Sequence, residues 1–277
     1  MAIDPTARVA DGARIGEGVE IGPYCLVGPD VELGSGVRLI ANVNVAGATT
    51  IGEGTVVYPY ASLGTPPQSV HYHGGRTRLT IGSHCELREG VTMNTGTEAG
   101  GGITSVGERC LLMVGSHVGH DCHVGKNVTF ANNVVLGGHV IVGDYVFLGG
   151  HVAIHQFVRI GEGVMMAGLS GATGDIIPFG FALGHVASLI GLNVIGARRR
   201  GITRPELHRL RRAYRALFFG DGVFADRLEA VAASFASDPL VQKIIAFIRA
   251  GGKRPLMRPR PRAGAKTDGD ENADDAV

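Results

Sequence analysis

The sequence predicts an all-β solenoid, a parallel β-helix, followed by a small C-terminal α-helical domain. An aliphatic residue recurs every six positions over the first two thirds of the chain, glycine accounts for 44 of the 277 residues, and aromatic residues make up only 6%. An interior with so few large rings has to be filled by small aliphatic side chains. Such a fixed short period is typical of a parallel β-helix.

The repeat locates both the solenoid and its interruptions. The first aliphatic run is Val9, Ile15, Ile21, Val27, Leu33, Leu39, Val45, Ile51, Val57 and Leu63. After Ile81, Leu87 and Met93 the phase slips by one, and a second run follows at Val106, Leu112, Val118, Val124, Phe130, Leu136, Val142, Leu148, Ile154, Ile160 and Met166. A single hexad buries little until others stack on it, so the repeats must form an array. We therefore expect a β-helix over 1–190 with loop insertions at 64–80 and 94–105.

Cysteine usage and charge exclude several classes of protein. The four cysteines form no CxxC pair and lie on the small inward position of their hexads, which predicts core packing for Cys25, Cys85, Cys110 and Cys122. A formal net charge of +1 argues against a general nucleic-acid binder. No segment reaches the roughly 18 apolar residues of a spanning helix, and the N-terminus lacks a signal-peptide pattern. We expect a cytoplasmic protein without stable membrane insertion.

The pattern becomes helical after about residue 190. Thr203 and Glu206 form a capping box, and Gly220 can end the helix that they begin. Further helices are predicted from Phe224 to about Phe235 and from Asp238 onward. We expect a helical domain over 191–252 and a disordered tail over 253–277, where charged residues, proline and glycine dominate.

The hexads resemble those of the left-handed parallel β-helix, in which three hexads complete one triangular coil. This resemblance alone implies the left hand, because the general rule for parallel crossovers favours the right. Residues eighteen apart should then stack in adjacent coils, about 4.8 Å apart. Gly138 would lie over His120 with Gln156 above it, and His139 would lie over Asp121.

Histidines and one carboxylate gather along a single edge of these coils. They come from GSHVGHDCHVG and the two following coils: His117, His120, Asp121, His123, His139 and His155. Acyl transfer needs a histidine base, a carboxylate that orients it and an N–H that receives an oxyanion, and this edge supplies all three. A zinc site of the carbonic anhydrase type is a second interpretation. A non-catalytic scaffold with exposed turn histidines is the third.

The ordered motifs LLMVGSHVGHDCHVG, ANNVVLGGHV, GGHVAIHQFVRIGEGVMMAGLSG and GLNVIGARRRGITR resemble the UDP-N-acetylglucosamine acyltransferases that begin lipid A biosynthesis. The resemblance implies His120 as general base, Asp121 as its partner and the Gly138 N–H as oxyanion donor. It implies that Gly168 sets the acyl length. The implied acceptor- and nucleotide-binding residues are Ser69, His71, His117, His139, His155, Gln156, Asn193, Arg199 and Arg200.

The same resemblance implies transfer of a 3-hydroxyacyl chain from acyl carrier protein to the 3-position of UDP-N-acetylglucosamine, in a homotrimer that needs no cofactor or metal. Ser69 and His71 stand where the family usually has an acidic residue and a lysine, Asn94 replaces a histidine, and Ile195 replaces a glutamate. These departures leave a UDP sugar with a 3-amino group open as the acceptor. The basic run at 209–215 is either a docking face for the acidic carrier protein or a solvated helix surface.

Overall fold

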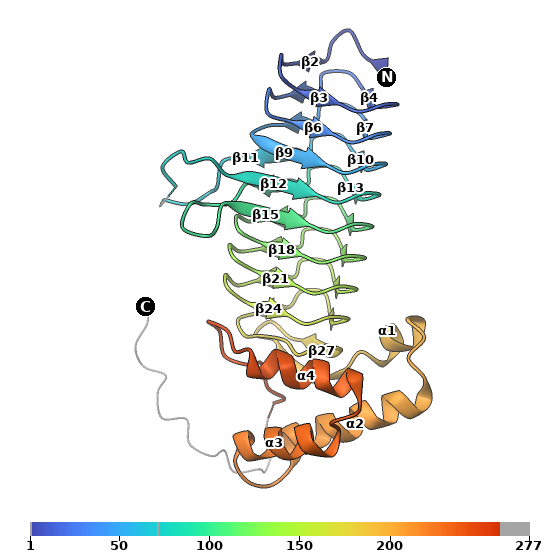
Figure 1. Cartoon of the computed structure of the whole chain (residues 1–277), viewed down its shortest axis with the longest axis vertical. Coiled ribbons are helices and arrows are strands. Elements are labelled where there is room, and N and C mark those ends of the chain that lie inside the picture. Colours follow the sequence, from blue (N-terminus) through green and yellow to red (C-terminus); the bar gives the residue numbers. More distant parts are fainter. Residues whose placement is uncertain (1, 71, 261–277) are drawn as a thin grey trace.

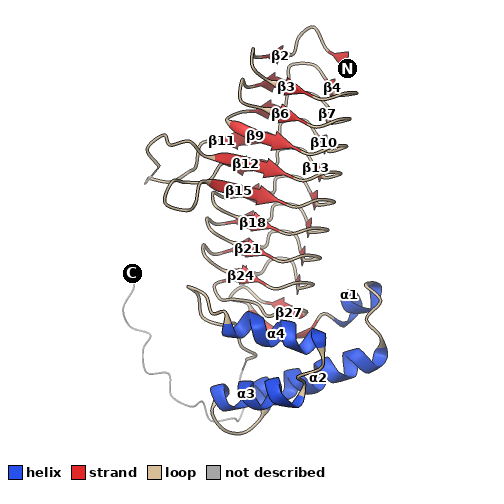
Figure 2. Ribbon diagram, viewed as in Figure 1, coloured by secondary structure: helices blue, strands red, loops and turns tan. Residues whose placement is uncertain are grey.

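The computed structural model describes residues 2–70 and 72–260, so the predicted acceptor residue His71 lies outside the described part. The chain winds into a tall stack of coils with its N-terminus at one end and four helices at the other (Figures 1 and 2). Among the described residues, the structure contains no helix long and apolar enough to cross a membrane.

Three sheets form the sides of the solenoid, and each coil contributes one short strand to each sheet. The first sheet contains β1 (Ala2–Ile3), β4 (Glu20–Ile21), β7 (Arg38–Leu39), β10 (Val56–Val57), β13 (Glu86–Leu87), β16 (Leu111–Leu112), β19 (Thr129–Phe130), β22 (Phe147–Leu148), β25 (Met165–Met166), β27 (Gly180–Leu183) and β28 (Ser188–Leu192). The second contains β2 (Arg8–Val9), β5 (Leu26–Val27), β8 (Asn44–Val45), β11 (Ser62–Thr65), β14 (Thr92–Asn94), β17 (His117–Val118), β20 (Val135–Leu136), β23 (Ala153–Ile154) and β26 (Gly171–Ala172). The third contains β3 (Arg14–Ile15), β6 (Glu32–Leu33), β9 (Ala48–Ile51), β12 (Arg78–Ile81), β15 (Ile103–Val106), β18 (His123–Val124), β21 (Ile141–Val142) and β24 (Arg159–Ile160).

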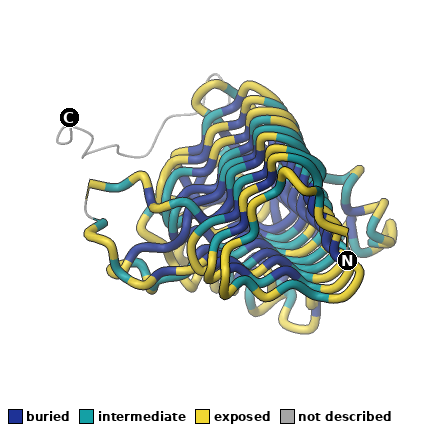
Figure 3. The backbone as a smooth tube through the Cα atoms, turned by 90° about the horizontal axis from the view of Figure 1, so that it is seen from above, coloured by how far each residue is buried: buried dark blue, intermediate teal, exposed yellow. Residues whose placement is uncertain are grey.

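The strand register confirms the predicted stacking of residues eighteen apart. His117 pairs with Val135, and Val118 pairs with Leu136. The repeating aliphatic side chains point inward, so stripes of buried residues run through successive coils (Figure 3). All four cysteines are buried among them, as predicted. Burial raises the pKa of Cys122 to about 12, which makes its thiol a poor nucleophile.

Many corners of the solenoid place a side chain in the left-handed backbone region. Asn127, Asn133 and Tyr145 have φ of 54°, 60° and 58° at such corners. Asp121 and His139 occupy equivalent positions, with φ of 59° and 61°. Asn, Asp and His are several-fold enriched among the non-glycine residues that adopt this conformation. The turn geometry therefore fixes where two of the predicted site residues lie.

The interruptions of the repeat become loops outside the coils. Residues 66–77 connect β11 to β12, and residues 95–102 connect β14 to β15. Both loops project from the same side of the solenoid (Figure 1).

The helices are α1 (Val194–Arg199), α2 (Arg204–Phe219), α3 (Phe224–Ser234) and α4 (Pro239–Arg249). The predicted capping box is formed, because the Thr203 side chain accepts from the Glu206 N–H and Glu206 accepts from the Thr203 N–H. The short helix α1 was not predicted as a separate element. Its signal is Asn193, whose side chain caps it by accepting from the Gly196 N–H.

Two features at the C-terminal end differ from the sequence-based expectation. The last strand, β28, runs to Leu192 and pairs antiparallel with β27, so a hairpin ends the solenoid. Residues 253–260, expected to belong to a disordered tail, instead hydrogen-bond to the last coil. The Asp175 N–H donates to the Pro255 carbonyl, and the Met257 N–H donates to the Asp175 carbonyl, each at 2.8 Å. Residues 261–277 of that expected tail lie outside the described residues.

Candidate active site

The histidine cluster lies at the corner between β17 and β18. His120 and Asp121 form this corner, and the next coil places Gly138 and His139 beside them through a hydrogen bond from the His139 N–H to the His120 carbonyl at 2.9 Å. The following coil adds Phe157, whose N–H donates to the Gly138 carbonyl at 3.0 Å. The columns predicted from the sequence are therefore present.

His120 and Asp121 form a hydrogen-bonded pair. His120 Nδ1 lies 2.8 Å from Asp121 Oδ2, and the side chains are 17% and 1% exposed. Because an ionised carboxylate can only accept, Nδ1 carries a proton, and in the neutral form of the ring Nε2 has a free lone pair. Within residues 2–70 and 72–260, Nε2 has no hydrogen-bond partner. A base that can accept a proton from an incoming group needs this arrangement.

Thr97 also holds the carboxylate of Asp121. Its N–H donates to Oδ1 at 2.8 Å and its hydroxyl donates to Oδ2 at 2.7 Å. Burial by itself would raise the pKa of Asp121, but the hydrogen bonds from Thr97 and His120 outweigh it and bring the pKa below the ordinary value. Asp121 is therefore ionised at neutral pH and fixed in one orientation.

Gly138 lets the backbone of the next coil approach the His120 ring. A Cβ atom at this position would lie 2.5 Å from His120 Cε1 and 2.7 Å from His120 Nε2. Any residue other than glycine at position 138 would therefore force the His120 ring to move. Within the described part of the chain, the Gly138 N–H has no hydrogen-bond acceptor. An N–H beside the base is thus available to a ligand.

His139 lies against both members of the pair. Its Nε2 is 3.7 Å from Asp121 Oδ2, its ring meets the His120 ring edge-on at 5.1 Å, and it stacks on Phe157 at 4.5 Å. Burial lowers the pKa of His139 more than the Asp121 charge raises it, so its imidazole is neutral at pH 7.

The remaining histidines of the edge differ in environment. His117 is half-buried, and its Nδ1 lies 2.8 Å from Thr92 Oγ1. Burial, followed by the nearby His120, lowers the pKa of His117. His155 and Gln156 are exposed one coil further on, and His155 Nδ1 lies 3.2 Å from the Gln156 carbonyl.

The ligand atoms of His120, Asp121 and His139 lie within 4.8 Å of one another, so these residues have the spacing of a metal site. The hydrogen bonds that Asp121 already accepts argue against metal binding at this site. Asp121 Oδ2 accepts from the Thr97 hydroxyl and from His120 Nδ1–H, so a metal would have to displace the hydrogen bond that orients His120. The geometry favours a base and its carboxylate over a zinc centre.

Comparison with known proteins shows which family this is. The family model described as UDP-N-acetylglucosamine O-acyltransferase, domain 2, matches residues 175–257, and a bacterial transferase hexapeptide model matches 103–138. The acyl-[acyl-carrier-protein]–UDP-N-acetylglucosamine O-acyltransferase of Azorhizobium caulinodans is 58% identical over 257 residues, which cover 93% of this chain and 95% of that protein. The protein of the same name from Caulobacter vibrioides is 50% identical over 259 residues, covering 94% and 98%. The chain belongs to the UDP-N-acetylglucosamine O-acyltransferase family.

Solved structures of this family have the same fold. A crystal structure of a UDP-N-acetylglucosamine acyltransferase superimposes with a TM-score of 0.91 at 37% identity, covering 94% of this chain and 100% of that one. The Campylobacter jejuni enzyme gives 0.88 at 37% identity, covering 93% and 100%. The predicted fold class, a left-handed parallel β-helix with a C-terminal helical part, is confirmed.

The residues that the family resemblance assigns to the nucleotide lie apart from the histidine corner, near the end of the solenoid. A hollow of about 520 Å³ is lined by Asn193, Ile195 and Arg199 together with apolar side chains of β22, β25 and β27. Asn193 already caps α1 and also donates from Nδ2 to the Gly163 carbonyl at 3.0 Å. Arg199 is exposed at this hollow.

Arg200 has a different environment from Arg199. Its guanidinium pairs with Glu162 and lies 4.2 Å from the centroid of the Tyr145 ring. Lys243 of α4 binds the same carboxylate at 2.5 Å. Arg200 thus links the helices to the solenoid within one chain.

The predicted acceptor loop is held against the solenoid by Asn94. The Asn94 side chain is buried and donates from Nδ2 to Thr65 Oγ1 and to the Pro66 carbonyl, both at 3.0 Å. Ser69 is half-buried in this loop, and its carbonyl accepts from the Tyr72 N–H at 3.2 Å. Asn94 therefore supports the loop that carries Ser69.

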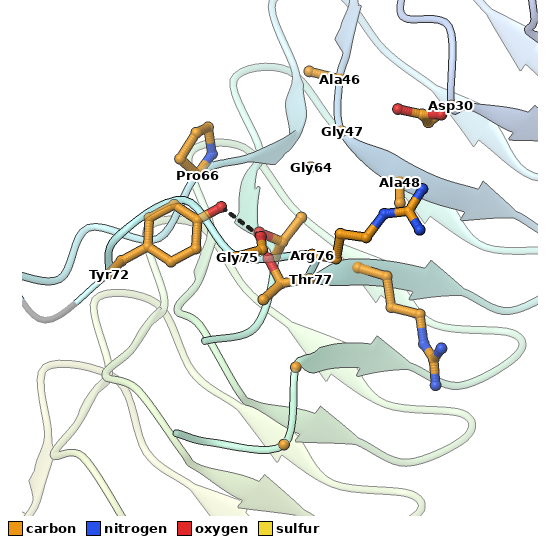
Figure 4. Close-up of a pocket in the computed structure, with 14 residues that line it drawn as sticks. Asp30, Ala46, Gly47, Ala48, Gly64, Pro66, Tyr72, Gly75, Arg76 and Thr77 are labelled. Carbon is orange, nitrogen blue, oxygen red and sulfur yellow. Dashed lines mark hydrogen bonds between the residues drawn. The ribbon is translucent and has the colours of Figure 1, made fainter. Parts of the chain in front are cut away.

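A hollow of about 690 Å³ lies at the base of the same loop (Figure 4). Tyr72, Arg76, Arg78 and Thr95 line it, and the Tyr72 hydroxyl donates to the Gly75 carbonyl at 3.1 Å. None of the described histidines lines this hollow. Its size alone does not make it the reaction site.

Gly168 is exposed, and a Cβ atom there would lie 3.1 Å from the Gly150 carbonyl oxygen. The acyl-length role implied by the resemblance stays a prediction.

Sequence reasoning missed Thr97 and Phe157, which hold Asp121 and His139 in place. Thr97 lies in an insertion without the six-residue period, so no repeat signal could have placed it beside Asp121.

Proposed function

We propose that this chain transfers a 3-hydroxyacyl group from acyl carrier protein to the 3-position of UDP-N-acetylglucosamine, the first step of lipid A biosynthesis. The observation that carries the proposal is the Thr97–Asp121–His120 arrangement beside the Gly138 N–H. The names of the family members cited above support the donor and the acceptor. The reaction as proposed needs no cofactor.

In the proposed mechanism, His120 acts as the general base. Nε2 takes the proton of the acceptor 3-hydroxyl as its oxygen attacks the thioester carbonyl, and the ionised Asp121 stabilises the imidazolium that forms. Nε2 then returns the proton to the leaving thiolate when the carbon–sulfur bond breaks. The ester, the carrier thiol and neutral His120 are the products, so protons and electrons balance.

The Gly138 N–H is the proposed oxyanion donor. The tetrahedral intermediate places negative charge on the former carbonyl oxygen, and a fixed N–H next to the base stabilises it without reorganisation. Only glycine allows this N–H so close to His120, because any Cβ atom would meet the ring.

The substrate-binding residues are proposed by family position. By that position, His117, His139, His155 and Gln156 would line the corner where the acceptor sugar lies, and Ser69 and His71 would contribute to acceptor binding from the first insertion of the repeat. Arg199 faces the hollow proposed for the nucleotide. Because the Arg200 guanidinium is already paired with Glu162, we expect Arg200 to contribute less to nucleotide binding than Arg199 does.

The acceptor can also be the 3-amino analogue of the sugar. Ser69 replaces an acidic residue and His71 a lysine of the usual family pattern, and loss of a lysine lessens repulsion of an amine that is partly protonated. A competition assay with equal concentrations of both UDP sugars decides between them. A strong preference for the 3-hydroxyl sugar would exclude the amine.

A cytoplasmic homotrimer completes the proposal. Flat solenoid sides can bury against copies of themselves under cyclic symmetry, and the nucleotide residues of one subunit would then approach the histidine corner of the next. Arg211, Arg212 and Arg215 are exposed on α2, whereas Arg209 pairs with Asp238 at 2.5 Å. We propose these three exposed arginines as part of the docking surface for the acidic carrier protein.

The test is turnover of UDP-N-acetylglucosamine with a set of 3-hydroxyacyl carrier proteins by the wild type and by His120→Ala. Removing the base should lower kcat about 100-fold or more while the fold is retained. His151→Ala is the matched control, since His151 is an exposed corner histidine outside the cluster. Near-normal activity of His120→Ala would exclude the mechanism, and activity that depends on added zinc would favour the anhydrase-like alternative.

A further inference from the structure

The segment after α4 returns along the solenoid to the catalytic corner. We call residues 253–258 the C-terminal strap. Its backbone bonds to Asp175 through Pro255 and Met257, and the Met257 side chain is buried. These contacts anchor the strap without using the side chain of Lys253.

Lys253 begins the strap, and its ammonium lies against the catalytic corner. Lys253 Nζ is 4.2 Å from the centroid of the Phe157 ring. His139 stacks on the same Phe157 ring, with centroids 4.5 Å apart and an angle of 11° between the ring planes, so the ring contacts both the imidazole and the ammonium. Arg254 adds a hydrogen bond from Nε to the Gln156 carbonyl at 2.9 Å. Lys253, Phe157, His139 and Asp121 thus form a continuous row.

His139, in this row, and His120, beside it, both face the same oxygen of the Asp121 carboxylate. His120 Nδ1 is 2.8 Å from Asp121 Oδ2, and His139 Nε2 is 3.7 Å from it. A protonated His139 would gain from moving closer to this oxygen and would weaken its bond to His120. The proposed base keeps its orienting partner only while His139 stays uncharged.

We propose that Lys253 is a positioning residue of this active site, which acts through the Phe157 ring to hold His139 in place and uncharged, and so reserves Asp121 for His120. The inference rests on the proposed function, because it concerns the partner of the proposed base. A cation over an aromatic face is attracted to it, which fixes the ring on which His139 stacks. The same cation disfavours a positive charge on the neighbouring His139 imidazole.

The charges around His139 support this assignment. Burial is the main cause of its lowered pKa, and Asp121 opposes it. His120, Lys253 and His123 each lower the pKa further. Of these three residues, only Lys253 lies outside the histidine cluster.

The experiment compares Lys253→Met, which keeps an apolar stem, with Lys253→Arg, which restores the cation, in the full-length protein. The pKa of His139 is measured by NMR titration of its ring protons, and kcat/KM is measured from pH 5 to 9. Because the two groups contact the same partly solvated aromatic ring and are not in direct contact themselves, Lys253→Met should raise the His139 pKa by only about 0.3 to 0.7 units. The acid limb of kcat/KM should move to higher pH by a similar amount, and Lys253→Arg should reverse most of both shifts.

Two controls separate this role from a general effect of charge. Lys126→Met removes an exposed lysine at a different corner of the solenoid, between β18 and β19, and should leave both readouts unchanged. In a His139→Asn background, Lys253→Met should no longer move the acid limb. An unchanged His139 pKa in Lys253→Met, or an equal shift in Lys126→Met, would overturn the inference. Absence of turnover in the wild type would overturn the proposed function instead, and the titration of His139 would still decide whether Lys253 acts on it.

Discussion

Gly138→Ala tests the geometry of the proposed site without removing any functional group. The added Cβ atom would lie 2.5 Å from His120 Cε1, whereas ordinary contact begins at 3.4 Å. The ring must therefore retreat by about 1 Å, because carbon atoms pack at roughly 3.5 to 4.0 Å. Such a shift would lengthen the 2.8 Å bond from His120 to Asp121 beyond hydrogen-bonding distance.

We expect this displacement to lower kcat about 100-fold, since a misplacement of 1 Å in a catalytic group can cost that much. The assay is steady-state transfer from acyl carrier protein, with thermal unfolding measured in parallel. Gly28→Ala is the control, because its Cβ atom would have nothing closer than the Val45 carbonyl oxygen at 3.4 Å. Wild-type turnover by Gly138→Ala would refute the contact between Gly138 and His120 as a feature of catalysis.

Three further predictions follow from the same structure. Gly168→Met should shift preference towards shorter acyl donors, because each excluded methylene is worth about 0.8 kcal/mol; an unchanged donor profile across a series of acyl carrier proteins would exclude Gly168 as the length determinant. The lowered pKa of Asp121 means that its ionisation stabilises the fold above the ordinary Asp pKa and that this contribution is lost as pH falls through the lower folded pKa. Melting temperatures of the wild type and Asp121→Asn should therefore converge below about pH 4, and a constant difference would contradict this. Asp175→Ala should destabilise the protein by about 3 to 5 kcal/mol, because it leaves Arg159, bonded to Asp175 at 2.7 Å, without its buried partner. Denaturant unfolding followed by circular dichroism measures this in a chain that has no Trp.

The proposed catalytic corner was largely predictable, because a fixed repeat converts the spacing of residues in the sequence into their distance in space. Eighteen residues make one coil, so the prediction that Gly138 and His139 lie over His120 and Asp121 needed only an uninterrupted repeat. The structure confirms both stackings. The roles assigned to these residues stay predictions for the experiments above.

Outside the six-residue repeat, the spacing of residues in the sequence could not predict which of them lie close together. Thr97 lies in an insertion and Lys253 follows the last helix, and no repeat relates either residue to the corner. The tail prediction failed at residues 253–260 for a similar reason. The composition of this segment favours disorder. The backbone N–H and carbonyl of Asp175, in the last coil, nevertheless need hydrogen-bond partners, and Pro255 and Met257 provide them.

The sequence by itself determined the solenoid, its inward aliphatic column, the helix caps and the residues gathered at one corner, because each depends on local spacing. Only the tertiary structure decided which partners fix the site: Thr97 on Asp121, and Phe157 with Lys253 on His139. It also separated Arg199, which faces a hollow, from Arg200, which pairs with Glu162. These outcomes depend on contacts between segments far apart in the chain, whose approach is set by packing and not by any pattern within one segment.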